Sequence, residues 1–562
     1  MCVLFINPPV EDFFFTPQRA YPLGILSLAT VLDKSGFKVN ILNCLEEYTK
    51  KTLPVPKEFS YLKRYYQPNL SPFCLFSHYY RFGINETEIC EKIKTFRPDI
   101  VGISSNFTAY FNSSLAMARL VKSIDKRITV VFGGRLPTIW PDLALSNPYI
   151  DFSLRGEAEF TFLELCQALK KGEIKNISGL CYKKFDKKLF ISRHIPLIPD
   201  LNMLPVANRR LIAYKKYKFQ GFFSTALLTS RGCARGCAFC AILEPFRYRK
   251  AENVIKEIED CFSLGIRHFN FEDDNINLNP EFEKIIDKII EKFNNKIKIS
   301  FMNGLLSLGI SRRLGEKLIR VGLTHLDLSI ASSNRRIRAK LGRSELPLNV
   351  SRLAAFMARR KVKTTVHFIV GLPDQAFKDI LRDIRFLSAR PLMLGPSIFY
   401  PVIESRLFAE LKRKFLIKKE SYQFFRSSVA FFDKAISRDR IFLIFYVSRV
   451  INFIKGLLDD KGVKNNDIAG LLQKKLNDFH LENNIIEAKT RFDRITLGEI
   501  VLRELLERGK LYRVRQLKVN KSFRYIFDEE KYILAADIKR ILHGLKIKGI
   551  KDQSVRLCLR KD

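Results

Sequence analysis

The sequence contains few histidines, seven in 562 residues, and none of them precedes His78. No G-x-G-x-x-G motif follows the first predicted strand, which argues against a nicotinamide cofactor. Arg449 and Lys455 interrupt the most apolar run, 441–458, so we expect a buried or surface-attached helix there and no transmembrane span. The opening Met-Cys-Val-Leu lacks the basic n-region of a signal peptide, which favours a cytoplasmic protein.

Acidic residues are also scarce, because 58 Asp and Glu stand against 97 Lys and Arg and leave a formal net charge of +39. Such an excess indicates either an acidic partner, such as nucleic acid or anionic lipid, or many solvated basic side chains. The basic residues are not concentrated in a tail, so we favour solvated faces and keep nucleic-acid binding as an alternative of a different class. The remaining composition is that of a globular protein, long enough for roughly three domains.

Three of the eleven cysteines form a tight cluster, Cys233-Ala-Arg-Gly-Cys237-Ala-Phe-Cys240, and the others are scattered. An odd total and a single cluster predict a metal site in a reducing compartment, not a set of disulfides. Three thiolates at this spacing can hold a [4Fe–4S] cluster on one loop and leave its fourth iron open. Zinc is the alternative metal, but it normally takes four protein ligands, and His194 and His268 are distant in the sequence.

Residues 1–195 alternate short apolar strands with helices, starting with strands at 3–7 and 38–43. This alternation predicts an α/β domain with a parallel sheet, doubly wound and flavodoxin-like. Residues 45–80 are expected to be irregular, and three prolines mark 196–222 as a linker. Ligands of such sheets bind beyond the carboxyl ends of the strands, which here are Asn7, Ser104-Ser105-Asn106 and Gly133-Gly134.

A second alternating segment spans residues 223–405 and contains six predicted strands. Six units are too few for the eight-stranded barrel and predict a partial (β/α)6 barrel, with its chemistry at the carboxyl ends of the strands. Residues 406–562 are predicted to form a basic, mostly helical C-terminal region. The predicted strands of the barrel are 225–230, 268–272, 298–303, 325–330, 363–371 and 396–402.

The C-x-x-x-C-x-x-C motif, with Phe239 before its last cysteine, resembles the signature of the radical S-adenosylmethionine (SAM) superfamily. The resemblance implies that Cys233, Cys237 and Cys240 hold a [4Fe–4S] cluster whose open iron binds the amino and carboxylate groups of SAM. It further implies reductive cleavage of SAM to methionine and a 5′-deoxyadenosyl radical that abstracts a substrate hydrogen. A flavodoxin or ferredoxin would then supply the electron.

The same resemblance implies a set of SAM contacts. Carboxylates after the second barrel strand correspond to contacts with the SAM amino group, and serines after the fourth correspond to contacts with its ribose. The segment Phe368-Ile-Val-Gly371-Leu-Pro373 matches the one near the adenine. Any of these residues could instead only cap a helix or form a turn. The predicted SAM-binding residues are Phe239, Glu272, Asp273, Asp274, Asn303, Ser329, Ser332 and Gly371.

The N-terminal segment resembles the cobalamin-binding domain of cobalamin-dependent radical SAM enzymes, on the basis of Tyr21-Pro-Leu-Gly24, residues 98–105, Gly133-Gly134 and Arg155-Gly156-Glu157. The Asp-x-His-x-x-Gly segment that supplies an axial imidazole in many cobalamin proteins is missing, so the cobalt is expected to lack a histidine ligand. A domain that has lost the cofactor is the alternative. The implied cobalamin contacts are Ser104, Ser105, Asn106, Gly133, Gly134, Gly156 and Glu157.

Taken together, the resemblances imply a cobalamin-dependent radical SAM methyltransferase that acts on an unactivated carbon of a small-molecule or lipid-like substrate. A cobalamin-associated radical rearrangement is the nearest alternative, and an RNA-modifying or nucleic-acid-binding protein is the more distant one. His367 lies on an alternating predicted strand, where its side chain could face the barrel interior, but we expect His367 and Tyr400, at the end of the sixth strand, to be ordinary core residues.

Overall fold

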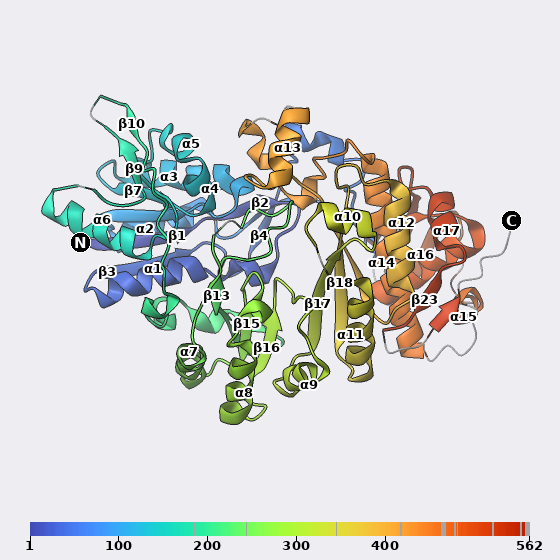
Figure 1. Cartoon of the computed structure of the whole chain (residues 1–562). Helices are drawn as coiled ribbons and strands as arrows, with labels where there is room; N and C mark the ends of the chain where they lie inside the picture. Colours follow the sequence, from blue (N-terminus) through green and yellow to red (C-terminus); the bar gives the residue numbers. More distant parts are fainter. Residues whose placement is uncertain are drawn as a thin grey trace.

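The computed structural model describes residues 1–562 apart from 175, 185, 243, 344, 416, 418, 462–467, 477–478, 480, 520–521, 551–553 and 557–562. The molecule is elongated, with the N-terminal sheet at one end, the green and yellow strands in the middle and the C-terminal helices at the other end (Figure 1). Apart from residues 54–78, the three parts therefore follow one another in space in the order of the chain.

The N-terminal sheet has seven strands in the order β10-β9-β8-β7-β6-β1-β3, of which β8 to β3 are parallel. Alternate residues of β1 belong to two separate cores. Val3 and Phe5 pack with α1 and α6 on one face, and Leu4 and Ile6 pack with α2 and α3 on the other. Helices thus cover both faces of the sheet. The elements are β1 (Cys2–Asn7), β3 (Lys38–Asn43), β6 (Ile100–Ser104), β7 (Thr129–Gly133), β8 (Phe152–Leu154), β9 (Leu180–Lys183), β10 (Leu189–Phe190), α1 (Leu23–Lys34), α2 (Glu86–Phe96), α3 (Phe111–Ile124), α4 (Arg135–Ile139), α5 (Pro141–Leu145) and α6 (Glu159–Lys171).

The prediction of an α/β fold with a parallel sheet is confirmed, but residues 45–80 are more ordered than expected. Strands β4 (Lys50–Leu53) and β5 (Tyr79–Phe82) pair with β2 (Val10–Asp12) in a small antiparallel sheet. This sheet has no signal in the sequence, because each strand is only three or four residues long and β2 lies far from β4 and β5 along the chain. Helix α2 was likewise not predicted.

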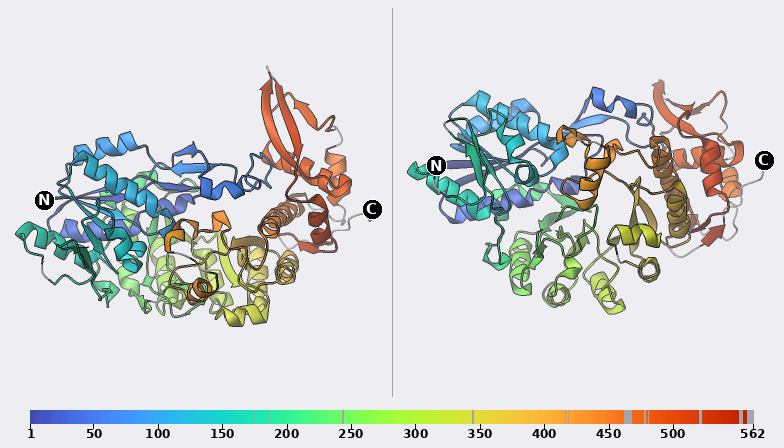
Figure 2. Two further views of the ribbon diagram at one scale, coloured as in Figure 1. Left: turned by 90° about the horizontal axis from the view of Figure 1, so that it is seen from above. Right: turned by 45° about the horizontal axis from the view of Figure 1, so that its top comes forward.

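Residues 54–78, which we call the crossing segment, leave the N-terminal domain and pack on the C-terminal region (Figure 2). The Tyr61 hydroxyl donates to the carbonyl oxygen of Val429 at 2.6 Å, and the rings of Tyr65 and Phe442 lie 4.2 Å apart. Farther along, the backbone N–H of Leu70 donates to the carbonyl of Val514 at 2.9 Å. The crossing segment therefore belongs by its contacts to the core of a region that lies more than 350 residues later.

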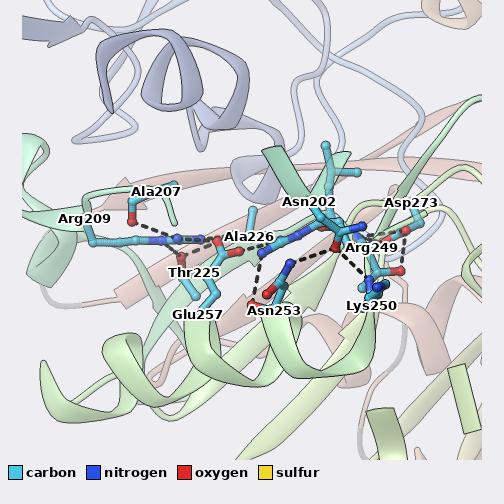
Figure 3. Close-up of polar contacts among 12 residues, drawn as sticks. Asn202, Ala207, Arg209, Thr225, Ala226, Arg249, Lys250, Asn253, Glu257 and Asp273 are labelled. Atoms are coloured by element: carbon cyan, nitrogen blue, oxygen red, sulfur yellow. Dashed lines mark hydrogen bonds and ion pairs between the residues drawn. The ribbon is translucent and has the colours of Figure 1, made fainter. Parts of the chain in front are cut away.

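The predicted linker, 196–222, is anchored to the barrel by a buried arginine. The Arg209 guanidinium forms an ion pair with Glu257 and donates to Thr225 Oγ1 at 3.2 Å (Figure 3). Arg249 binds the second oxygen of Glu257 at 2.5 Å. Burial alone would raise the pKa of Glu257, but the two arginines lower it, so the carboxylate is charged and holds the linker in place.

Six parallel strands follow, in two groups of three. Strands β12, β15 and β16 form one sheet with the short β11, and β17, β18 and β19 form the other. A parallel bridge between Leu305 and Leu328 joins the two groups. The strands are β11 (Lys218–Phe219), β12 (Phe222–Leu227), β15 (His268–Phe271), β16 (Lys298–Phe301), β17 (His325–Ala331), β18 (Lys363–Val370) and β19 (Met393–Ile398), with helices α7 (Ala251–Ser263), α8 (Phe282–Phe293), α9 (Arg312–Arg320), α10 (Arg335–Lys340), α11 (Pro347–Arg359) and α12 (Phe377–Ser388).

Four of these six strands begin and end within two residues of the predicted positions, but β12 and β19 begin three residues earlier than expected. In both cases the prediction placed the strand over residues that leave the sheet and line the space above it. Leu228 and Ser230 follow β12, and Phe399 and Tyr400 follow β19. The shift matters because it moves these residues from the sheet to the mouth of the barrel.

The C-terminal region is helical, as predicted, but it also contains five strands that were not expected. Strands β20, β21 and β22 form an antiparallel sheet, and β23 pairs with β24. The long helix α14 is apolar enough to span a membrane, yet 72% of its most apolar window is buried inside the protein. The elements are α13 (Arg406–Phe415), α14 (Arg438–Lys461), α15 (Ile468–Lys475), α16 (Arg494–Arg508), α17 (Ala535–Leu542), β20 (Ile485–Ala488), β21 (Tyr512–Val519), β22 (Ser522–Glu529), β23 (Lys546–Lys548) and β24 (Ser554–Arg556).

Candidate functional site

The three clustered cysteines lie on the loop between β13 (Ser230–Arg231) and β14 (Arg247–Tyr248), just beyond the carboxyl end of β12. Gly232 opens the loop with φ 80°, and a Cβ there would lie 2.3 Å from the carbonyl oxygen of Pro245. Only glycine allows the two ends of the loop to approach so closely. All three cysteines line one cavity of about 410 Å³, which we call the cluster cavity.

Two side-chain donors lie against the sulfur atoms. Asn275 Nδ2 is 3.1 Å from Cys233 Sγ, and Arg343 Nη1 is 3.8 Å from Cys237 Sγ. Such N–H groups stabilise the negative charge of cluster-bound thiolates. Among the described residues no three His, Cys, Asp or Glu side chains converge as they would around a single ion. Because a four-iron cluster is larger than one ion, three cysteines lining a cavity fit such a cluster.

A second cavity, of about 600 Å³, lies between the carboxyl edge of the N-terminal sheet and the mouth of the barrel, and we call it the sheet-edge cavity. Asn7, Ser104 and Gly133 line it from the sheet, and Leu228 and Glu272 line it from the barrel. The contacts of Glu157 explain how these two parts stay together. Its carboxylate binds Arg247 at 2.8 Å, binds Arg231 at 3.5 Å and accepts the backbone N–H of Ile198 at 2.6 Å.

The two cavities are neighbours, because Ile242 and Asp274 line both of them. Burial raises the pKa of Asp274 to about 6, helped by the nearby carboxylates of Asp273 and Glu244. One apolar and one acidic side chain thus form part of the boundary between the two spaces. Molecules held in the two cavities would meet at this boundary.

The three predicted carboxylates after β15 point in three different directions. Asp274 lies between the cavities, whereas Glu272 lines only the sheet-edge cavity, where burial raises its pKa to about 7. Asp273 lines neither cavity. Its carboxylate accepts the backbone N–H of Thr229 at 3.0 Å and the hydroxyls of Thr229 and Ser230 at 2.8 and 2.5 Å. These contacts give Asp273 the role of fixing the start of the cysteine loop.

The other predicted SAM contacts divide in the same way. Phe239, Asn303 and Ser329 line the cluster cavity, and Ser332 and Gly371 line neither cavity. The Ser332 hydroxyl donates to the buried Asp383 at 3.0 Å. Gly371 has φ 87°, and a Cβ there would lie 3.2 Å from Ile441, so a glycine is needed for the turn and for close packing against Ile441.

Six of the seven predicted cobalamin contacts line the sheet-edge cavity: Ser104, Asn106, Gly133, Gly134, Gly156 and Glu157. Ser105 is buried just outside it, and its hydroxyl has no partner among the described residues. The Ser105 carbonyl lies 3.0 Å from the position of a Cβ on Gly134, which explains the glycine there. No histidine is among the described residues that line this cavity.

Sequence reasoning missed several lining residues. Arg19 and Tyr110 line the sheet-edge cavity from the short 3-10 helices Pro17–Ala20 and Thr108–Tyr110, which have no recognisable sequence pattern, and Arg343 lines the cluster cavity. His367, expected in the core, also lines the cluster cavity, with 42% of its side chain exposed and Nε2 bonded to Asp327 at 2.8 Å. The alternation of polar residues along β17 and β18 was the available signal, because alternate residues of a barrel strand face the interior.

Comparison with known families agrees with this geometry. A model of the radical SAM superfamily matches residues 227–387, and a model of the B12 binding domain matches residues 77–166. The first span contains the cysteine loop, and the second contains the sheet-edge loops after β6 and β7. The chain therefore contains a radical SAM domain and a B12-binding domain. The predicted resemblance and the cofactors that it implied are therefore confirmed at the level of the family.

Among curated proteins, this chain is 30% identical to an uncharacterised methyltransferase of Pyrococcus horikoshii over 53% of the chain and 66% of the relative. It is 24% identical to cytidylyl-2-hydroxyethylphosphonate methyltransferase of Streptomyces wedmorensis, over 74% of the chain and 83% of the relative. It is 25% identical to the anaerobic magnesium-protoporphyrin IX monomethyl ester cyclase of Rubrivivax gelatinosus, over 59% and 61%. The chain thus spans slightly less than two thirds of the first and third relatives.

Among solved structures, the radical SAM methyltransferase TsrM of Kitasatospora setae, determined with tryptophan and a SAM analogue, has a TM-score of 0.58 at 16% identity, covering 74% of this chain and 76% of that one. The cobalamin-dependent radical SAM enzyme OxsB has a TM-score of 0.56 at 14% identity, covering 85% and 69%. At these identities the likeness establishes a shared fold.

Proposed function

We propose that this protein is a cobalamin-dependent radical SAM methyltransferase that acts on an unactivated carbon of a small molecule. The observation that carries the proposal is the pair of adjoining cavities, one lined by the three cysteines and one by the edge of the B12-binding domain. Bound in these cavities, the cluster with SAM would supply a hydrogen-abstracting radical and cobalamin would supply a methyl group. Bringing the two to one substrate carbon is what a shared boundary contributes.

In the cluster cavity, Cys233, Cys237 and Cys240 would hold three irons, while Asn275 and Arg343 donate to the sulfurs. Asp274, Asn303, Ser329 and Phe239 are the predicted SAM contacts that lie there, and Asp274 is the carboxylate suited to an ammonium group. Glu272, Asp273, Ser332 and Gly371 lie elsewhere, so we propose that they support the site without touching SAM.

In the sheet-edge cavity, the backbone at Gly133, Gly134 and Gly156 would allow a large ring to approach, and Ser104, Asn106 and Glu157 would offer polar contacts. The parallel strand order β3-β1-β6-β7-β8 supports a flavodoxin-like domain, and the two groups of three parallel strands support a partial barrel. We divide the chain at 195, 222 and 405 as the sequence suggests, but assign the crossing segment 54–78 to the C-terminal region.

Hydroxocobalamin binding tests the cobalamin half of the proposal. The anaerobically reconstituted protein should bind hydroxocobalamin in a base-off, His-off state, because no histidine lines the cavity among the described residues. Electron paramagnetic resonance of the Co(II) form should then show no nitrogen superhyperfine splitting. Absence of binding would remove the methyltransferase proposal and leave the radical chemistry. Nitrogen splitting would mean that either the cofactor's own benzimidazole or a histidine such as His78 binds the cobalt, and 15N labelling of the protein distinguishes the two.

Methyl transfer itself is tested with SAM whose S-methyl group is deuterated. A metabolite extract from a strain that lacks the gene should contain the substrate, and the enzyme with flavodoxin or ferredoxin as electron donor should add the deuterated methyl group to it. A product without the label would favour a radical rearrangement or ring closure, the second candidate, which the cyclase from Rubrivivax gelatinosus makes reasonable. Steeply salt-dependent RNA binding would instead favour the nucleic-acid alternative suggested by the charge of +39.

A further inference from the structure

Helices α10 and α13 are attached directly to the cysteine loop. Ala238, in the middle of the loop, donates its backbone N–H to the carbonyl of Leu341, which follows α10, at 3.0 Å. The Ala238 carbonyl accepts the backbone N–H of Leu407, in α13, at 2.8 Å. The Arg406 guanidinium donates to the carbonyl of Gly236 at 2.7 Å. Both helices therefore bind the stretch of backbone that carries the three cysteines.

The loop also reaches the surface of the protein on this side. Ala234 and Gly236, which lie between Cys233 and Cys237, are exposed. Gly342, just after α10, is exposed as well, and a Cβ there would lie 3.6 Å from the Gly236 carbonyl. The backbone between two of the predicted cluster ligands is thus open to a partner that binds beside α10 and α13.

The surface around this opening is strongly basic, and we call it the basic face. It comprises the exposed side chains of α10 and α13, where seven basic residues stand against three acidic ones at or beside these helices, Asp374, Glu404 and Glu410. Besides Arg406, the basic residues are Arg335, Arg336, Lys340, Lys412, Arg413 and Lys414.

The two helices form one continuous charged surface, because bases of both surround Asp374. Lys340 of α10 donates to the Asp374 carboxylate at 2.6 Å and lowers the pKa of that group. The charges of Lys414, in α13, and of Arg336, in α10, lower the pKa of Asp374 further.

The acidic residues of this surface already have partners. Glu410 binds Lys414 at 2.8 Å, and Glu404 lies 3.8 Å from Arg135 of the N-terminal domain. Four bases of the basic face, in contrast, form no ion pair with any described residue: Arg335, Arg336, Lys412 and Arg413. The basic face therefore has positive charge available for an acidic partner.

A net charge of +39 makes basic surfaces common in this chain, so charge alone does not select this one. Its attachment to the cysteine loop does. Among the described side chains of α10 and α13, the exposed apolar residues are only Ala339 and Ala409. A charged face with so little apolar area suits a transient protein partner, as in redox complexes, which bury small areas. Single-stranded nucleic acid fits less well, because bases stack on exposed aromatic rings and Phe408 is buried.

We propose that the basic face docks a small acidic electron-transfer protein that reduces the cluster. The proposal rests on the radical SAM half of the proposed function, in which the cysteine loop holds a [4Fe–4S] cluster. In each encounter the carrier loses one electron and the cluster gains it, and no bond forms between the two proteins. Complementary charges would speed the encounter, because electrostatic steering raises association rates by about 10–1,000-fold.

Charge reversal on α13 tests the proposal. The double variant Lys412→Glu, Arg413→Glu should slow reduction of the cluster by a reduced acidic flavodoxin at least about tenfold at low ionic strength, as followed by stopped-flow absorbance. Arg335→Gln, Arg336→Gln, which removes charge from α10 without reversing it, should slow reduction about threefold. The matched control is Lys170→Glu, Lys171→Glu, because these lysines also lie in the last turn of an exposed helix end, that of α6, and it should leave the rate unchanged.

Two further measurements separate docking from damage to the cluster. Dithionite needs no docking surface, so in about 0.5 M salt it should reduce the wild type and all variants at rates within about twofold. Raising the salt concentration should slow reduction by flavodoxin steeply in the wild type and only slightly in the α13 variant. Variants are compared at equal iron content. A parallel series with an acidic ferredoxin identifies the carrier, and slowing in either series supports the basic face.

Equal rates in the wild type and in the α10 and α13 variants, with both carriers, would overturn the proposal. So would loss of affinity for single-stranded RNA in the α13 variant with unchanged reduction rates, which would assign the basic face to nucleic acid. Cluster reduction requires neither cobalamin nor methyl transfer. A protein whose reduction depends on the basic face but which transfers no methyl group would therefore refute the methyltransferase proposal alone, and absence of iron would refute the radical SAM half.

Discussion

The edge of the N-terminal sheet and the mouth of the barrel both collect residues from the ends of parallel strands, yet they differ in how directly sequence position fixes a residue's place. At the sheet edge, residues that follow β6 and β7 line one cavity almost without exception. After β15, three consecutive carboxylates take three different places. Glu272 lines the sheet-edge cavity, Asp273 binds the start of the cysteine loop, and Asp274 lies at the boundary between the two cavities.

The difference has a geometric cause. The N-terminal strands belong to one continuous sheet, so their carboxyl ends form a single edge. The six parallel strands of residues 222–398 belong to two sheets, which the Leu305–Leu328 bridge joins. Strand ends therefore locate a cavity-lining edge well in one continuous sheet and only roughly where the strands are divided between two sheets.

The largest effect is expected at the cysteine loop. Cys237→Ala should abolish the brown chromophore and the content of about four irons per chain after anaerobic reconstitution, because two thiolates retain a cluster poorly. Cys166→Ala, at a fully buried cysteine of α6, should leave the iron content unchanged. Iron and sulfide analysis makes the comparison, and full iron content in Cys237→Ala would contradict the assignment.

At the sheet edge, two glycines separate packing from binding. Gly156 has φ 74°, and a Cβ would lie 2.3 Å from the Pro196 carbonyl, so Gly156→Ala should lower the free energy of unfolding by about 3–4 kcal/mol. Gly133 has open space around its Cβ position, so Gly133→Ala should fold normally and change only hydroxocobalamin affinity. Denaturant titration and spectroscopic titration distinguish the two, and similar stabilities would contradict the interpretation.

The neighbouring carboxylates Asp273 and Asp274 allow the same separation of a stabilising role from a binding role. Asp273→Ala removes the acceptor for Thr229 and Ser230 and should lower the free energy of unfolding by about 2–3 kcal/mol. Asp274→Ala should leave stability nearly unchanged but weaken SAM binding about tenfold through loss of a charge-assisted bond. Thermal melts and equilibrium dialysis of SAM measure the two effects. Weaker SAM binding in a stable Asp273→Ala protein would reverse the roles.

The last comparison concerns pH. Burial raises the pKa of Glu272 from 4.5 to about 7, so the native protein binds more protons than the unfolded chain between these values. The contribution of this carboxyl to stability is complete below pH 4.5 and is lost as the pH rises to about 7. In the cofactor-free protein, the free energy of unfolding of Glu272→Gln should therefore rise relative to that of the wild type by about 2–3 kcal/mol as the pH goes from 5 to 8.

Denaturant titrations at several pH values measure this gain. Glu164→Gln, at an exposed carboxyl on α6, is the control and should show no comparable change. A Glu272→Gln protein whose stability relative to the wild type is independent of pH would show that the carboxyl is solvated in the free protein.

The sequence by itself determined the features that depend on short spacing. The three cysteines lie within eight residues, so one loop must hold them together whatever surrounds it. The alternation of strands and helices likewise required parallel sheets, and the structure has them. The carboxyl ends of the N-terminal strands line a cavity, and their role in binding stays a prediction.

Only the tertiary structure decided which long-range partners each segment meets. The crossing segment carries no sign in its own residues that Tyr61 would donate to Val429, because β-type pairing and aromatic packing accept many partners. The direction of Asp273, the position of His367 beside Asp327 and the unpaired Nε2 of His268 depend on backbone turns and on neighbours from other elements. Residue type and spacing fix a possible chemistry, whereas packing selects which atom faces which cavity.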